Sequence, residues 1–217
     1  MKENQLLEIL RESYRYNDIS KLSLYPQDKY LLDIAFQHDV GLLVGNMMKL
    51  DRQQRLANRI IEQKNLKRYY ENFVHFGPVA DAFEKSSIQY VITKGVYAAK
   101  TAYINEGLRR SDDLDVIINR DDYSKVKNIL QDHGYIQGYY DPKTGKITKF
   151  TRKQELFYLS FTDQSAPFVK KTGDDFLPIV NLDINFQIFW DKKKPWNIHQ
   201  LLSGNPAGRG IPPQTPE

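Results

Sequence analysis

Two aspartates separated by one residue, Asp113 and Asp115, are the first candidates for chemistry in the sequence. They lie in a short apolar run typical of a strand, in which side chains alternate between two faces. Leu114, Val116 and Ile118 would then enter a core, while both carboxylates project from the opposite face. Neighbouring carboxylates repel each other unless a cation joins them, and their oxygens suit Mg²⁺ or Mn²⁺. The pair therefore predicts a divalent-cation site, although acidic pairs of this spacing also occur by chance.

A third carboxylate, Asp183, lies in a later run where apolar and polar side chains alternate with unusual regularity. One predicted face of this run is apolar, and the other carries Asp183 between Asn181 and Asn185. On this pattern alone, the run fits equally well the solvent-facing side of an antiparallel strand. If it lies beside Asp113 and Asp115 instead, the three carboxylates meet at one site.

The elements that must position these residues begin with a helical region over the first 85 residues. This region is rich in Leu, Ile, Glu, Lys and Arg and contains few helix breakers. Predicted helices cover 4–14, a segment that starts near Pro26, 42–50 and 51–85. Gly77 and Pro78 predict a break in the last of these helices, because both residues are poor in a helix interior.

From residue 87 onward the sequence changes to short apolar runs, which are typical of strands. Predicted strands cover 89–93, 114–119, 135–140, 147–162 and 178–190. A helix over 121–133 is expected to end at Gly134, and 141–145 has the residues of a turn. A helical spacer is expected after Gly95. The alternation of strands and helices predicts an α+β fold.

Three regions follow from this division. A helical amino-terminal region covers 1–85, and an α+β core with a mixed sheet covers 86–190. Residues 191–217 are first basic and then rich in Gly and Pro, so we expect a flexible tail there, because such a composition buries little surface.

A set of charged and small residues follows one order along the chain: Lys94-Gly95, Arg109, the pair Asp113 and Asp115, and Asp183. This order of Lys-Gly, Arg-x-x-x-Asp-x-Asp and a late Asp on a strand resembles a family of uncharacterised nucleotidyltransferases in the DNA polymerase β-like superfamily. The resemblance covers the greater part of the chain, from the second predicted helix to the last predicted strand. Two positions depart from the pattern: Val96 stands where many relatives have Ser or Gly, and Asn185 stands where the family often has His.

The resemblance implies a polymerase β-like core over 86–190 and transfer of a nucleoside monophosphate from an NTP such as ATP to an acceptor hydroxyl, with pyrophosphate leaving. It implies that the catalytic residues are also the ligands of Mg²⁺ or Mn²⁺, namely Asp113, Asp115 and Asp183. It further implies that the nucleotide-binding residues are Lys94, Gly95, Arg109 and Ser111. The acceptor is a small molecule, a protein or RNA.

Composition limits the other classes of function. The chain has no cysteine, so disulfides, thiolate nucleophiles and Cys-ligated zinc are excluded, and its four histidines are scattered. Its formal net charge of +4 permits a phosphate-bearing ligand or nucleic acid without requiring one. No apolar run approaches the roughly 20 residues of a membrane-spanning helix, and the amino terminus is too polar for a signal peptide. We therefore expect a cytoplasmic protein with no membrane partner.

Several alternatives remain to be weighed. The GxxxxGK(S/T), GxGxxG and GxSxG motifs are absent, which removes the kinase, dinucleotide-binding and hydrolase interpretations that depend on them. A glycosyltransferase could use the acidic pair, but it would not account for Lys94-Gly95 or Asp183. Arg109-x-Ser111-x-Asp113 also resembles toxin-like nucleotidyltransferases that act on RNA. A catalytically degenerate relative that only binds a nucleotide or nucleic acid is the non-enzymatic alternative. The sequence decides neither the NTP, the acceptor nor the oligomeric state.

Overall fold

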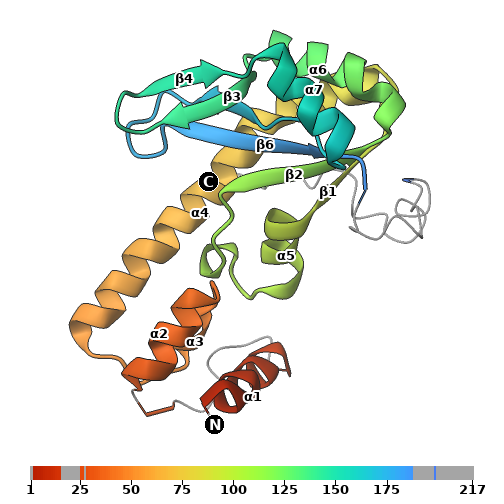
Figure 1. Cartoon of the computed structure of the whole chain (residues 1–217). Helices are drawn as coiled ribbons and strands as arrows, with labels where there is room; N and C mark the ends of the chain where they lie inside the picture. Colours follow the sequence, from red (N-terminus) through yellow and green to blue (C-terminus); the bar gives the residue numbers. More distant parts are fainter. Residues whose placement is uncertain (1, 16–24, 27, 188–197, 199–217) are drawn as a thin grey trace. The chain divides into compact units, whose positions relative to one another are not determined.

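The computed structural model describes residues 2–15, 25–26, 28–187 and 198 of the chain (Figure 1). The chain divides into two compact units, of which unit 1 comprises Met1–Tyr69 and Tyr97–Ser111, and unit 2 comprises Tyr70–Val96 and Asp112–Glu217. The predicted tail over 191–217, apart from Ile198, lies outside the described residues. No helix within the described ranges is both long enough and apolar enough to cross a membrane.

The described residues of unit 1 are mostly helical. It contains α1 (Lys2–Arg15), α2 (Lys29–Gln37), α3 (Gly41–Asn46), the first half of α4 (Arg52–Lys85), most of α5 (Lys94–Ala102) and η2 (Glu106–Leu108). Helix α2 begins three residues after Pro26, because Asp28 caps it by accepting a hydrogen bond from the Leu31 backbone N–H at 3.1 Å. The core of this unit includes Ile9, Leu31 and Val44, all fully buried.

Helix α4 continues without interruption through Gly77 and Pro78, so the predicted break is wrong. Proline removes one backbone N–H, which leaves the carbonyl of Val74 without its helical partner, and Val74 is exposed, so water can bond to it. Phe76 and Phe83 lie on either side of the proline and are buried. Their burial offsets the cost of about 3 kcal/mol of a proline inside a helix.

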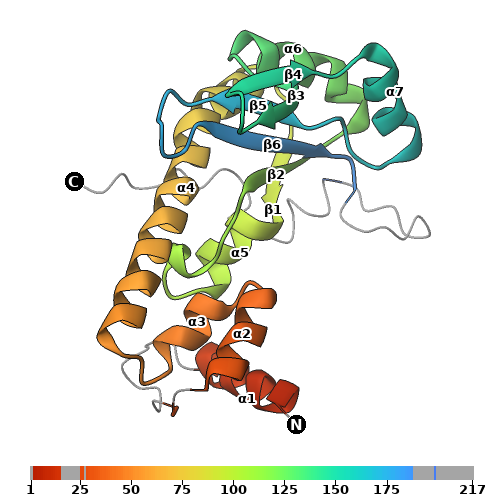
Figure 2. The ribbon, with the colours of Figure 1, turned by 60° about the vertical axis from the view of Figure 1, so that its left-hand side comes forward.

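Unit 2 is built on a mixed six-stranded sheet, which confirms the α+β class. The strands are β1 (Tyr90–Thr93), β2 (Asp113–Ile118), β3 (Ile136–Asp141), β4 (Lys146–Lys149), β5 (Phe168–Lys171) and β6 (Ile179–Asn185). Their order in the sheet is β1-β2-β6-β5-β3-β4; β2 and β6 are parallel, and the other neighbours are antiparallel. Helix α6 (Tyr123–Asp132) and the carboxy-terminal half of α4 cover one face (Figures 1 and 2).

The covered face of the two central strands is apolar, in agreement with the predicted alternation. Leu114 and Val116 of β2 and Leu182 and Ile184 of β6 are at most 1% exposed. Phe83 of α4 packs edge-on against Tyr90 of β1, with ring centres 5.6 Å apart. The polar side chains of β2 and β6 therefore lie on the opposite face of the sheet.

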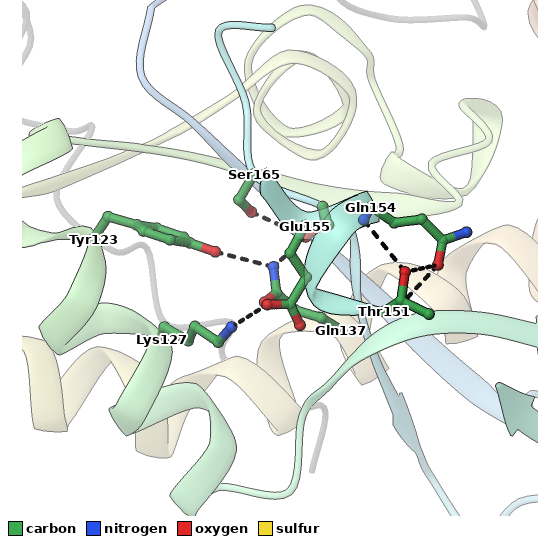
Figure 3. A network of polar contacts seen from close by, with 8 residues as sticks. Tyr123, Lys127, Gln137, Thr151, Gln154, Glu155 and Ser165 are labelled. Atoms are coloured by element: carbon green, nitrogen blue, oxygen red, sulfur yellow. Dashed lines mark hydrogen bonds and ion pairs between the residues drawn. The ribbon is translucent and has the colours of Figure 1, made fainter. Parts of the chain in front are cut away.

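The prediction of strands over 147–162 is only partly correct, because β4 ends at Lys149 and α7 (Arg152–Phe161) follows. Thr151 and Gln154 form a capping box, in which each side chain bonds to the backbone of the other residue, and this box starts the helix (Figure 3). The prediction also missed β5, whose four residues are few for a recognisable alternation. The predicted turn over 141–145 is present between β3 and β4.

Gly138 is required where β4 approaches β3 closely. A Cβ atom at this position would lie 2.3 Å from the backbone oxygen of Thr148. We expect Gly138→Ala to lower the free energy of unfolding by about 1–3 kcal/mol, measured by urea denaturation. Gly77→Ala is the matched control, because a Cβ there meets nothing within 4 Å, and it should stabilise α4 by about 0.5–1 kcal/mol. Equal unfolding midpoints for the two variants would contradict this account of the hairpin.

Candidate active site

The pairing of β2 with β6 brings the three predicted aspartates to one face of two neighbouring strands. In this parallel register Asp113 lies beside Asn181, and Asp115 lies beside Asp183. Paired residues of adjacent strands share a face, and so do residues two apart on one strand. Asp113, Asp115 and Asp183 therefore line the same face of the sheet, although Asp183 comes from a distant part of the sequence.

Lys94 and Asn185 hold the carboxylate of Asp115. The Nζ atom of Lys94 lies 2.5 Å from Oδ1 of Asp115, and Nδ2 of Asn185 donates a hydrogen bond to the same oxygen at 3.0 Å. Nζ of Lys94 also lies 3.5 Å from Oδ1 of Asn185. Because Asp115 is only 4% exposed, these partners balance a charge that water hardly reaches.

The backbone of Lys94 is strained at the junction of β1 and α5. Its φ angle is 55°, in the left-handed region that favours glycine. For a residue with a Cβ atom this conformation costs about 1–2 kcal/mol. Strained residues of this kind cluster at functional sites, where the surrounding structure holds them in place. Here the strain coincides with the side chain that contacts Asp115.

Burial and neighbouring carboxylates raise the pKa values of Asp113 and Asp183. Burial, and then the charge of Asp115, raises the pKa of Asp113, although Lys94 acts in the opposite direction. Burial raises the pKa of Asp183 to about 6, and the charges of Asp113 and Asp115 add to this increase. Lys94 thus neutralises the negative charge of the group only in part.

A divalent cation fits this donor set in its chemistry. Carboxylate oxygens are the preferred protein ligands of Mg²⁺, and a cation would balance the charges of carboxylates that lie beside one another on β2 and β6. Within the described part of the chain, no three His, Asp or Glu side chains are already arranged closely enough to hold a metal ion. The aspartates are therefore brought together by their strands without forming a closed ligand cage.

Thr93 is a polar residue of this face that the sequence analysis missed. It pairs with Asp115 across β1 and β2, and its Oγ1 atom is buried without a hydrogen-bond partner. A buried hydroxyl without a partner is costly, unless a ligand supplies the missing contact. The signal that could have found Thr93 is its position directly before Lys94-Gly95 at the end of a strand.

The other two predicted nucleotide-binding residues belong to unit 1. Nη1 of Arg109 donates a hydrogen bond to the Tyr103 hydroxyl at 3.3 Å, and the guanidinium lies over the Tyr103 ring, 5.7 Å from its centre. Ser111 is 6% exposed, and its buried Oγ has no hydrogen-bond partner. The structure thus brings together Lys94 and the aspartates within unit 2 and describes Arg109 and Ser111 in unit 1.

Comparison with known proteins identifies the family. The model of a family described as uncharacterised nucleotidyltransferase matches residues 27–210, which include all the predicted site residues. No curated protein and no solved structure matches the chain. Nucleotidyltransferases are transferases of phosphorus-containing groups, and such enzymes generally use divalent metals. Because the match extends over most of the sequence, this chain belongs to the uncharacterised nucleotidyltransferase family.

Proposed function

We propose that this protein transfers a nucleoside monophosphate from an NTP to an acceptor hydroxyl, with release of pyrophosphate, in a reaction that needs Mg²⁺ or Mn²⁺. Membership of the family supports the class of reaction. The observation that carries the proposal is the alignment of Asp113, Asp115 and Asp183 on one face of β2 and β6. Phosphoryl transfer depends mainly on positioning and on neutralising charge, and carboxylates that hold divalent cations serve both needs.

In this proposal, Asp113 and Asp115 act on the NTP, and Asp183 acts on the acceptor hydroxyl. Asp113 and Asp115 would hold the cation that accompanies the triphosphate, and Asp183 would hold a cation beside the acceptor. A bound divalent cation supplies positive charge to the phosphate oxygens. The carboxylate of Asp183 accepts the proton of the acceptor hydroxyl in this proposal.

The amino terminus of α5 binds the triphosphate in this proposal. Lys94 is the first residue of the helix, and 54% of its side chain is exposed, so its ammonium can reach the leaving pyrophosphate. Gly95 lets the backbone approach phosphate closely, at the positive end of the helix dipole. The family resemblance also assigns nucleotide binding to Arg109 and Ser111, which belong to unit 1. Within unit 2, the mixed arrangement of β1, β2 and β6 supports a polymerase β-like core.

A relative that binds a nucleotide without turning it over is the second candidate. The ion pair between Lys94 and Asp115 favours it, because this pair engages a proposed cation ligand. The same ion pair is compatible with turnover if the triphosphate attracts the Lys94 ammonium away from Asp115. Release of pyrophosphate distinguishes the two candidates.

Removal of divalent cations tests the proposed function. Each common NTP, labelled at the α-phosphate, is incubated with the protein and a cell extract as the source of acceptors. We expect pyrophosphate release and a labelled product with Mg²⁺, loss of both with EDTA, and recovery when Mg²⁺ or Mn²⁺ is added back. Label on RNA would identify the toxin-like activity, whereas label on a small molecule or a protein would identify those acceptors.

The opposite outcomes are equally distinct. Binding of an NTP without pyrophosphate release would establish the inactive relative. Transfer of the γ-phosphate instead of the α-phosphate would show a phosphotransferase, and it would overturn the roles given to the aspartates.

A further inference from the structure

The β3–β4 hairpin and α7 carry a row of aromatic side chains, which we call the aromatic strip. Its members are Tyr139, Phe150, Tyr158, Phe157 and Phe161. Successive rings in this order have centres 5.1 to 6.4 Å apart. Tyr139, Phe157 and Phe161 are 53%, 57% and 74% exposed. The strip thus presents several adjacent ring surfaces to the solvent.

Polar contacts hold helix α7 in place, together with the contact between its Tyr158 ring and Phe150. None of its residues is buried. Lys127 of α6 forms an ion pair with Glu155 at 2.7 Å (Figure 3), and Arg120 donates hydrogen bonds to the backbone oxygens of Leu159 and Thr162 at 2.9 and 3.3 Å. These contacts fix the helix and leave its aromatic rings available for another molecule.

Basic side chains accompany the rings. Lys146 lies on the hairpin face that carries Tyr139 and Phe150, since Lys146 pairs with Asp141 and Thr148 pairs with Tyr139. Lys153 is exposed and stands four residues before Phe157, so the two share one side of α7. Neither lysine takes part in an ion pair among the described residues.

Three acidic side chains near the strip, Asp141, Glu155 and Asp163, have partners among the described residues. Asp141 accepts hydrogen bonds from the Lys143 backbone N–H and the Thr144 hydroxyl, and it stabilises the turn of the hairpin. Glu155 is paired with Lys127, and Asp163 lies 4.0 Å from the Arg120 guanidinium. Asp141 keeps its negative charge, because both of its partners are neutral, and it pairs with Lys146 across the hairpin. The two lysines outnumber this one carboxylate, so the charge that remains for a partner is positive.

We propose that the aromatic strip binds single-stranded nucleic acid. Unpaired bases stack on exposed aromatic rings, and the backbone phosphates lie near lysines, which is the usual arrangement for this ligand. A second copy of the same positive surface would be repelled, so the charge disfavours self-association here. RNA and DNA single strands share the recognised chemistry. The inference goes beyond the proposed function, because binding needs neither an NTP nor transfer.

Replacement of Phe161 gives the sharpest test, because this ring is highly exposed and contributes little to the core. The probes are fluorescein-labelled oligo(U) and oligo(dT) of about 12 nucleotides, measured by anisotropy without NTP or metal. We expect Phe161→Leu, which keeps an apolar side chain but removes the ring, to weaken binding about 5- to 150-fold. Phe161→Trp should keep or increase affinity.

The lysines are tested by the salt dependence of binding. Lys146→Gln with Lys153→Gln should reduce the slope of log affinity against log salt concentration by about 1.4, because two phosphate contacts are lost. Phe176→Leu and Lys171→Gln are the matched controls, since both residues are exposed in unit 2 outside the strip, and these variants should bind like the wild type.

Three outcomes would overturn the proposal. Equal affinity of Phe161→Leu and the wild type would show that the rings do not stack on bases. Concentration-dependent dimerisation lost in the Phe161→Leu variant would show that a second copy occupies the strip. The third outcome combines two results: the wild type binds neither oligonucleotide, and Phe157→Ala lowers the urea midpoint of unfolding. Together they would show that the chain itself covers the strip.

Discussion

Asp183→Asn should lower Mg²⁺-dependent pyrophosphate release by at least about 100-fold, while the folded state becomes more stable. The variant keeps the size of the side chain but removes a charge that lies beside Asp115 in the sheet register. Loss of the carboxylate charge removes two proposed roles of Asp183, as a ligand of the cation and as the base that takes the proton of the acceptor hydroxyl. Steady-state pyrophosphate release with saturating NTP measures the effect.

The stability of the same variant separates a functional role from a structural one. Burial and two neighbouring aspartates raise the pKa of Asp183 in the folded protein. Ionisation of Asp183 therefore destabilises the folded state relative to the unfolded state, in which this carboxylate is exposed to water. In EDTA at a pH of about 8, we therefore expect Asp183→Asn to raise the free energy of unfolding by about 1–3 kcal/mol. The variant should accordingly unfold at a higher urea concentration than the wild type. Mg²⁺ should raise the midpoint of the wild type but hardly that of the variant.

Asp132→Asn is the matched control, because Asp132 is exposed at the end of α6 and its loss changes the net charge equally. It should match the wild type in rate. If Asp183→Asn kept the wild-type rate, the three-aspartate site would be wrong. If it lost both activity and stability, Asp183 would be a structural residue whose removal disturbs the sheet.

The strand face that carries the candidate site was predictable from the alternation of apolar and polar residues. In β2 and β6 every second side chain, from Leu114 to Ile118 and from Val180 to Ile184, is apolar and buried. The side on which Asp113, Asp115 and Asp183 lie therefore followed from the sequence. Alternation within a strand does not reveal which strands are neighbours. That β6 lies beside β2, in the register that pairs Asp115 with Asp183, is a long-range property supplied by the structure.

Local signals were less informative where tertiary contacts decided the outcome. The prediction of a break at Pro78 neglected that Phe76 and Phe83 could offset the lost hydrogen bond by burial. The apolar runs within 147–162 predict strands, although the capping box of Thr151 and Gln154 starts a helix. The positive φ angle of Lys94 had no signal in the sequence, because a lysine rarely adopts it.

Lys94→Gly and Lys94→Ala are expected to be equally inactive but unequally stable. Both variants lack the ammonium that contacts Asp115 and, in the proposed function, the leaving pyrophosphate. We expect each to lower kcat/KM for pyrophosphate release by about 100-fold. Glycine adopts a φ angle of 55° without strain, whereas alanine does not. The glycine variant should therefore be about 1 kcal/mol more stable than the alanine variant in urea unfolding.

The comparison of the two variants separates backbone strain from charge at the same residue. Both lose the same ion pair, so their difference in stability reports the strain alone, and their shared loss of activity reports the ammonium. Equal midpoints would show that the left-handed conformation is not strained in solution. Wild-type activity in both variants would remove Lys94 from the nucleotide site, and the ion pair with Asp115 would then be only structural. A strained lysine kept at the start of α5 is otherwise hard to account for, because glycine would fit that backbone at lower cost.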